Sequence, residues 1–405
     1  MTVPDLTLPA IADRELPLNV QAALFGSQVA ADRRYHLAFP GATDRTYPDL
    51  AAILTSQLLN NVGDPWTDGH GRNHTKPYEI DVVRRLGRLF SGDEHVWGYV
   101  ASGATEGTIH AIDEAATAYP DLVVYASTAA HYSVAKAARL VRAPLVHIRT
   151  DIHGRISLDH LRDELTRLAD RPAAIVATVG TTEHEAVDDV AAITGLCDDL
   201  QITRRRIHVD AALAGIPLAL LPDTERPTFG FDAGATSVVI SGHKFLSTLM
   251  PCAVIVYPHR PPTPVGGDVA YIGTSDTTIA GSRSGHTPLL LYWSLTTGGG
   301  LDGHRRRAHT ARELAAYTYD RLRGIGWAAQ WQPPAFTVTL AQPARDLPQP
   351  WVLGGDQKTG RIICMPGMRQ DWIDEFLSDL TSAHPGRTVI PMPRRGAALD
   401  PEHTS

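Results

Sequence analysis

Short apolar runs alternate with segments of helical periodicity through the middle of the chain. The run "LVVYAST" is typical of a buried strand, and "SVAKAARLV" after it is typical of a helix. Further strands are predicted in "PLVHIRT", "AAIVATVG", "RIHVDAAL", "TSVVIS" and "CAVIVYP". Helices are predicted at 103–119, 187–200 and 157–170, the last with Ser157 as its N-cap. Apolar strands that alternate with helices predict an α/β fold whose sheet is mostly parallel and covered on both faces.

The pattern changes towards both ends of the chain. The first 50 residues show no clear periodicity, and "RPPTPVGGDVAYIGTSDTTIAGSRSG" at 260–285 has the composition of a loop. A helix is predicted in "HTPLLLYWSLTTGG", and after it come a helix, two short strands ("AFTVTL", "GRIICMP") and a last helix. This organisation predicts an N-terminal arm, a large domain, a small C-terminal α+β domain and a disordered tail, at 1–58, 59–302, 303–388 and 389–405.

Composition limits which classes of partner and which cellular compartment are expected. With 405 residues, 43% of them hydrophobic, the chain can bury a large core. The net charge of −7 argues against nucleic acid and anionic membranes as partners. The N-terminus has no basic, apolar leader, and no run reaches transmembrane length, so a cytoplasmic protein is expected. The three cysteines form no CxxC pair, which favours a reducing compartment and predicts neither a disulfide framework nor a metal site.

Lysine is rare in this chain, and one lysine follows a predicted strand. Only four of the 37 basic residues are lysines, and Lys244 stands in "SVVISGHKFLST". A lysine amine can lose its proton and attack a carbonyl, whereas an arginine stays charged. Lys244 is therefore either a nucleophile or one of a few remaining surface lysines.

Three further polar features follow predicted strands, where sites in parallel sheets lie. The turn "SGATEGT" at 102–108 opens a helix and could bind a phosphate, His131 could stack on a flat ligand, and Asp210 needs a cationic partner such as a protonated ring nitrogen. Each has a plain alternative, namely a simple turn, a helix-capping histidine and a structural Asp–Arg pair. Together with Lys244, the four features match the needs of one cofactor, pyridoxal 5'-phosphate.

Longer segments carry a resemblance to a known family. They are "NNVGDP", "SGATEGT", "HYSVAKAARLVRAP", "VGTTEHEAVDDV", "IHVDAALAG", "SGHKFLSTLMPCAVIV" and "YIGTSDTTIAGSRSGHTPLLLYWSL". In these segments the chain resembles the group II pyridoxal-phosphate amino acid decarboxylases, in the branch of the histidine and serine decarboxylases. The resemblance implies the aspartate-aminotransferase-like fold type I with a seven-stranded sheet. Two departures stand out: Ala104 and Thr108 replace a glycine and an asparagine of the family's usual turn, and "EHE" after "GTT" replaces a more common basic-then-small pattern.

The resemblance implies a role for each matching residue. Lys244 would bind the cofactor aldehyde, Asp210 would pair with the ring nitrogen, and His131 would stack on the ring. Further cofactor contacts would come from Ala212 on the other face of the ring, from Ala104, Thr105, Ser241 and His243 at the phosphate, and from Thr182 near the ring hydroxyl or the substrate. Ser282 and Arg283 would come from the partner subunit of an obligate homodimer.

The implied reaction is the α-decarboxylation of an L-amino acid to an amine and CO₂. Tyr271 and His131 are both candidates for the acid that then protonates Cα, and the sequence does not choose between them. The 260–285 segment is either a closing lid or a static subunit contact.

The stretch "GDPWTDGHGRNHTKPYE" is expected to line the substrate side, and its ending looks more like the serine-type members of the family. A small polar amino acid, of the serine or histidine type, is the expected substrate. His70, His74 and Lys76 are candidate substrate contacts, or else part of a solvated loop. An aminotransferase, a decarboxylating oxidase and a cofactor-sensing regulator are alternative functions; the regulator would need a DNA-binding domain.

Overall fold

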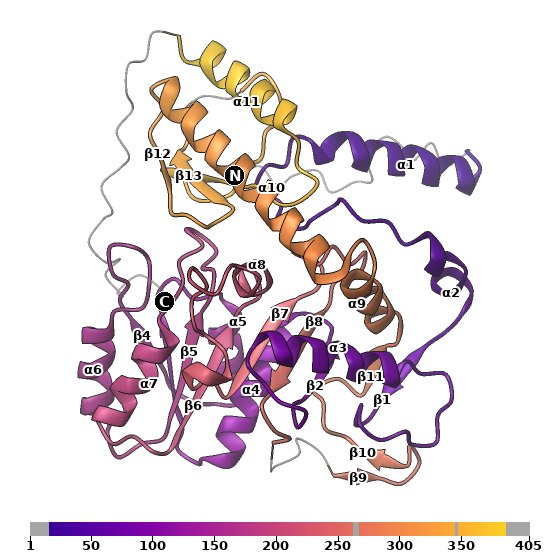
Figure 1. Ribbon diagram of the computed structural model, residues 1–405, viewed down its shortest axis with the longest axis vertical. Coiled ribbons are helices and arrows are strands. Elements are labelled where there is room, and N and C mark those ends of the chain that lie inside the picture. The colour runs from indigo at the N-terminus through magenta and orange to yellow at the C-terminus, as the bar shows by residue number, and fades with distance from the viewer. Residues whose placement is uncertain (1–15, 262–266, 345–346, 386–405) are drawn as a thin grey trace.

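A seven-stranded sheet forms the centre of the larger part of the molecule (Figure 1). The computed structural model describes residues 16–261, 267–344 and 347–385. The strand order is β2-β8-β7-β6-β5-β3-β4. The strands are β2 (Trp97–Ala101), β3 (Val123–Ser127), β4 (Leu145–Ile148), β5 (Ala173–Thr178), β6 (Arg205–Asp210), β7 (Ser237–Ser241) and β8 (Ala253–Tyr257). Strand β8 runs in the direction opposite to the other six strands of this sheet, so the prediction of a mostly parallel sheet is confirmed.

Helices cover both faces of this sheet because most of its strands are apolar on both sides. On one face, α4 (Ala104–Ala118) and α5 (Ser133–Leu140) pack against the strands. The main core lies on the other face and includes α3 (Lys76–Leu89), α6 (Leu158–Arg167), α7 (Val190–Asp199), α8 (Gly215–Ala219) and α9 (His286–Thr296). Ser157 is the N-cap of α6 as predicted, and its Oγ accepts a hydrogen bond from the His160 amide at 3.3 Å.

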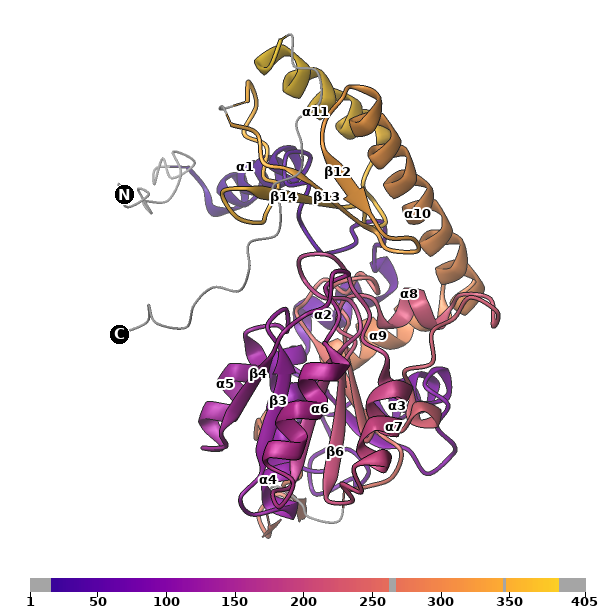
Figure 2. The same ribbon diagram turned by 90° about the vertical axis from the view of Figure 1, so that its left-hand side faces the viewer.

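The C-terminal part has a small sheet and a hydrophobic core of its own. The antiparallel strands β12 (Ala329–Trp331), β13 (Thr337–Ala341) and β14 (Thr359–Ile363) pack against α10 (Gly300–Gly324) and α11 (Gln370–Ala383) (Figure 2). Helix α10 begins before the domain boundary predicted at 303 and also contacts α8 and α9. The domain bounds therefore stay predictions, and the tail at 389–405 lies outside the described residues.

The N-terminal segment links the two parts. After α1 (Leu18–Arg33), the chain passes between them, where the Ala42 amide donates to the Lys244 carbonyl and the Thr43 amide to the Pro366 carbonyl, each at 3.0 Å. The helices η1 (Pro48–Leu50) and α2 (Ala51–Ser56) follow. The sequence has no clear periodicity in this segment, so α1, η1 and α2 were not predicted. Helix α1 buries no side chain in the described part of the chain.

Within 267–285, the described part of the segment contains short strands where its composition predicted a loop. Strand β9 (Asp268–Val269) pairs with β10 (Thr274–Ser275), and β11 (Ser282–Ser284) pairs with β1 (Asn60–Val62). The Asp64 amide donates to the Ser275 carbonyl, and the His70 amide to the Ile272 carbonyl, each at 2.8 Å. The expected substrate stretch thus lies against the 260–285 segment. Among the residues that the structure describes, no helix has the length and apolar character needed to cross a bilayer.

Candidate functional site

Four parallel strands bring the predicted residues to one edge of the sheet. In the sheet order, β7 lies beside β6, β6 beside β5, and β5 beside β3, and all three pairs are parallel. Lys244 follows β7, Asp210 ends β6, Thr182 follows β5 and His131 follows β3. Strand β2 runs in the same direction as β7, because β8 between them is antiparallel to both, so the turn into α4 reaches the same edge.

The turn that carries Lys244 is held by backbone contacts. The Gly242 amide donates to the Cys252 carbonyl at 2.8 Å, and the Thr248 amide donates to the Gly242 carbonyl at 3.2 Å. A side chain at Gly242 would bring its Cβ to 2.6 Å from the Cys252 sulfur, so the close approach requires glycine here. The direction in which Lys244 leaves the sheet is therefore fixed by its neighbours.

The ammonium of Lys244 experiences two opposing effects. Burial lowers the pKa of Lys244, and the carboxylates of Asp210 and Glu185 act against this lowering. The balance leaves the pKa below the usual value for lysine, which increases the fraction of free amine at neutral pH. A free amine is the form that attacks an aldehyde.

Asp210 is a buried carboxylate at the end of β6, with 6% of its surface exposed. Its Oδ1 accepts a hydrogen bond from the Ala212 amide at 3.1 Å, and its charge raises the pKa values of both His131 and Lys244. Its partner in the β5–β6 register is Thr178, whose buried Oγ1 has no hydrogen-bond partner in the described part of the chain. A buried hydroxyl of this kind is available to a polar ligand atom.

His131 lies between β3 and α5, partly buried. Its Nδ1 accepts from the Ser133 amide at 3.3 Å and lies 2.9 Å from the Ser133 Oγ. Burial lowers the pKa of His131, so the ring is mostly neutral near pH 7, with its proton on Nε2 because Nδ1 is an acceptor. A neutral ring held by its own helix start can lie flat against an aromatic ligand.

The start of α4 provides a site for an anion. Ala104 and Thr105 are the first two residues of α4, at the end of the helix where the helix dipole and the amides favour an anion. A Cβ added to Gly103 would meet nothing within 4 Å, so the space beside the turn is open. Glu106 fixes the turn, since its Oε2 accepts from the amide and the hydroxyl of Ser102 at 2.8 and 2.6 Å.

Thr108, which stands where the family's usual turn has an asparagine, points into the interior. Its Oγ1 lies 3.4 Å from Nε2 of His208, whose Nδ1 lies 2.8 Å from the Ser237 hydroxyl. Thr108 is fully buried, so its side chain packs between α4 and the sheet.

The other predicted cofactor contacts lie around the same edge. Ser241 is buried at the end of β7, and its amide donates to the Ala212 carbonyl at 3.4 Å. The ring of His243 is held by Cys252, whose amide donates to Nδ1 at 3.2 Å, and burial lowers the pKa of His243. Thr182 is exposed on the loop after β5.

Three further predicted residues lie on the 260–285 segment. Tyr271 has 84% of its surface exposed, and Ser282 is exposed as well. Arg283 is buried in an ion pair with Glu79, and its Nη2 donates to the Gly63 carbonyl at 3.1 Å. The predicted roles of Tyr271, Ser282 and Arg283 at a partner's site stay predictions.

Among the candidate substrate contacts, Lys76 is already bonded within the chain. Its Nζ donates to the carbonyls of Thr67 and Asp68 at 2.6 and 3.4 Å, and its side chain is buried. Lys76 therefore holds the backbone of the expected substrate stretch in place. His74 is partly buried and His70 exposed. Their contact with a substrate stays a prediction.

Sequence reasoning missed two polar groups near this edge, Thr178 and Glu185. Thr178 ends a strand like Asp210, but a threonine in an apolar strand is too common to draw attention. Glu185 belongs to the "EHE" departure, which was the only signal for it. Within 16–261, 267–344 and 347–385, no group of three or more potential ligands is arranged for a metal ion.

The chemistry of this edge fits pyridoxal phosphate. The fit rests on an open helix start for the phosphate, a buried carboxylate for a ring nitrogen, a neutral imidazole, an amine with a lowered pKa and the unpartnered hydroxyl of Thr178.

Comparisons with known proteins agree with this chemistry. The conserved domain of pyridoxal-dependent decarboxylases matches residues 108–326. The chain is 36% identical over 360 residues to a histidine decarboxylase of Mesorhizobium japonicum. The alignment covers 89% of this chain and 96% of the relative. It is 30% identical over 381 residues to serine decarboxylase 1 of Oryza sativa subsp. japonica. That alignment covers 93% of this chain and 78% of the relative.

The fold also matches a solved structure. An L-methionine decarboxylase from Streptomyces sp. 590 superposes with a TM-score of 0.79 at 22% identity, over 93% of this chain and 97% of that one. The sheet, the strand-end groups and the matched domain lead to one conclusion: the chain belongs to the pyridoxal-dependent decarboxylase family and is a pyridoxal-phosphate-dependent amino acid decarboxylase.

Proposed function

We propose that the protein removes the α-carboxyl group of a small polar L-amino acid, of the serine or histidine type, and that Lys244 is the residue that bonds to the cofactor. One observation carries the proposal: Lys244, Asp210 and His131 follow three different parallel strands and meet at one edge, where their charges interact. The relatives named histidine and serine decarboxylase, at least 30% identical over most of the chain, support the substrate class.

The cofactor supplies an electron sink for the electron pair that departing CO₂ leaves behind. Asp210 would hold a negative charge at the ring nitrogen, His131 would lie against one face of the ring, and Ala212 against the other. The phosphate would be bound by the first turn of α4, at Ala104 and Thr105, together with Ser241 and His243, while Thr182 would lie near the ring hydroxyl or the substrate.

Two residues are proposed as donors of the proton that Cα receives. Tyr271 is 84% exposed, so it would act in the site of a partner subunit. His131 would act in the site of its own chain, where Nε2 carries the proton that its hydrogen bonding assigns.

A homodimer with shared sites is part of the proposal, in which the segment that carries Ser282 and Arg283 comes to each site from the partner subunit. The exposure of Tyr271 and Ser282 on the 260–285 segment supports it. A cytoplasmic location is also proposed. It is supported by Cys197, Cys252 and Cys364, which are all free and buried.

The test joins cofactor attachment to product analysis. Borohydride reduction of the purified protein should fix the cofactor on Lys244, as found by peptide mass spectrometry, and Lys244→Ala should lose covalent binding and at least about 1000-fold in activity. A screen of the twenty amino acids should give CO₂ and an amine in equal amounts with a serine- or histidine-type substrate.

Other products would contradict the proposal. A keto acid would indicate an aminotransferase, whereas ammonia with peroxide would indicate a decarboxylating oxidase. Cofactor that remains covalently bound in Lys244→Ala, with activity at the wild-type rate, would show that another residue carries it.

A further inference from the structure

The loop between β5 and α7 is folded back on itself. The amides of Gly180 and Thr181 both donate to the Ala186 carbonyl at 3.0 Å, and the Glu185 amide donates to the Thr181 carbonyl at 2.8 Å. Glu185 has a φ of 53°, a left-handed conformation that is unfavourable for a residue with a side chain and easy for glycine. A glutamate therefore occupies a position whose backbone conformation favours glycine. Contacts of its side chain must offset the cost of that conformation.

The Glu185 side chain reaches into the C-terminal part of the molecule. It is buried, and its Oε2 accepts from the amides of Phe336 and Thr337 at 3.0 Å each and from the Thr337 hydroxyl at 2.7 Å. These donors stand at the start of β13. Burial raises the pKa of Glu185, and the three donors and the charge of Arg312 on α10 act against this rise.

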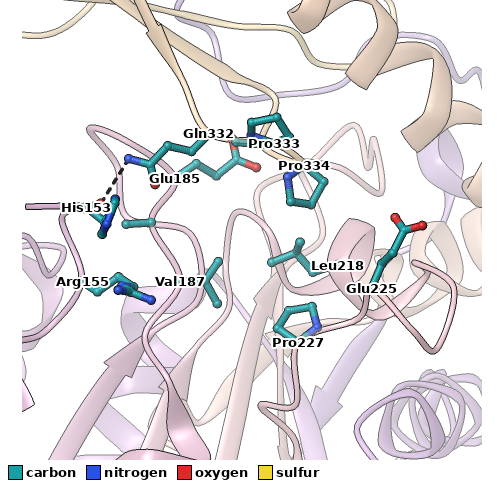
Figure 3. Close-up of a pocket in the computed structure, with 12 residues that line it drawn as sticks. His153, Arg155, Glu185, Val187, Leu218, Glu225, Pro227, Gln332, Pro333 and Pro334 are labelled. Carbon is teal, nitrogen blue, oxygen red and sulfur yellow. Dashed lines mark hydrogen bonds between the residues drawn. The ribbon is translucent and has the colours of Figure 1, made fainter.

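Glu183 makes a second connection from the same loop. Its Oε1 accepts from Nη1 of Arg361 on β14 at 2.7 Å, and the glutamate side chain is 49% exposed. Both carboxylates of "EHE" therefore bind the small sheet. Glu185 also lines a cavity of about 340 Å³ between the two parts, where the Gln332 side chain donates to the His153 carbonyl at 3.4 Å (Figure 3).

The same loop is continuous with the Lys244 site. It carries Thr182, and directly before it the Val179 amide donates to the Asp210 carbonyl at 2.8 Å. The Glu185 charge also acts on Lys244 and raises its pKa, although less than Asp210 does. The other charged or titratable groups that interact with Lys244 or Glu185 are His131, His243, Arg312 and Cys364.

We propose that Glu185 is a positioning residue that clamps the small sheet to the loop carrying Thr182. The inference rests on the proposed role of Lys244. Glu183 makes the outer half of the connection, to Arg361 on β14, so it tests whether the clamp depends on Glu185 itself.

Three variants of the holoenzyme test this proposal. Glu185→Gln keeps an acceptor oxygen for β13, Glu185→Gly fits the left-handed backbone but removes the clamp, and Glu183→Gln is the matched control. The measurements are the visible absorbance of the cofactor bond and kcat for CO₂ release. Glu185→Gln should leave the absorbance unchanged and keep kcat within about threefold, because its amide oxygen still accepts hydrogen bonds from β13.

Glu185→Gly should lose about tenfold or more in kcat, whereas Glu183→Gln should match the wild type in both measurements. The inference fails if both Glu185 variants match the wild type, or if Glu183→Gln loses as much kcat as Glu185→Gly. If borohydride does not fix the cofactor on Lys244 in the wild type, the proposed function itself fails. If it does, and the Glu185 variants match the wild type, only this inference is wrong.

Discussion

The reactive groups of this site differ from ordinary side chains of the same type because of what surrounds them. Burial lowers the pKa of Lys244, and the carboxylates of Asp210 and Glu185 raise it. Asp210 is held by the Ala212 amide and lies in the field of two groups that can be cationic, His131 and Lys244. A buried carboxylate without a bonded cation is costly, and a protonated ring nitrogen would offset that cost.

At this scale we expect Asp210→Asn to fold normally and to lose about 100-fold in kcat, because the electron sink weakens when the ring nitrogen loses its anionic partner. Steady-state CO₂ release measures the loss, and the thermal unfolding midpoint reports on the fold. Asp159→Asn removes an equal charge from the exposed first turn of α6 and serves as the control. Equal activity in the two variants would rule out the role proposed for Asp210.

At the scale of elements, a buried histidine joins three of them beneath the site. His208 on β6 bonds to Ser237 on β7 and lies against Thr108 on α4. Burial lowers the pKa of His208 to about 4, so the ring is neutral in the folded protein. The position of α4, whose first turn is proposed to hold the phosphate, thus depends on a neutral imidazole.

This histidine predicts a loss of stability in acid. The unfolded chain takes up a proton near the usual histidine value while the folded chain does not, so the contribution of His208 is full above about pH 6.5 and is lost as pH falls towards 4. The total loss is about 3 kcal/mol. Urea denaturation between pH 7 and 4 should therefore show a shallower fall in the free energy of unfolding for His208→Asn than for the wild type. Parallel curves would contradict the assignment.

At the scale of the whole molecule, helix α1 exposes apolar side chains on the outside of the described chain. Helix α1 stands apart from the rest of the described chain in Figure 1, and none of its residues is buried. Leu18, Phe25 and Val29 recur at helical spacing and share one face, with 82, 58 and 51% of their surface exposed. Such an apolar stripe fits the proposed homodimer, in which a second copy of the chain would cover it.

We therefore expect sedimentation of the purified protein to give twice the 43.8 kDa chain mass, and Phe25→Glu to dissociate at concentrations where the wild type stays associated. The specific activity of the variant should fall on dilution, because the proposed sites are shared. Ser27→Glu, on the opposite face of α1, should behave as the wild type. An active monomer would contradict the shared site.

Much of the fold could be predicted from periodicity and residue type. The alternation of apolar strands with helices predicted the parallel sheet, and six of its seven strands were identified. The arm was harder to predict, because no residue of α1 is buried in the part of the chain that the structure describes, so its pattern lacks the contrast of a helix on a core. The 260–285 segment was expected as loop because its strands are only two or three residues long.

For the site, the sequence by itself determined which groups meet. The carboxyl ends of parallel strands lie at one edge, so Lys244, Asp210 and His131 had to approach one another once the strands were assigned. Only the tertiary structure decided what each group contacts. Lys76 and Arg283 are bonded to backbone and to Glu79, and Glu185 reaches from the β5 loop to β13. Burial and charge partners come from segments far apart in the chain, and local sequence patterns carry no record of those distances.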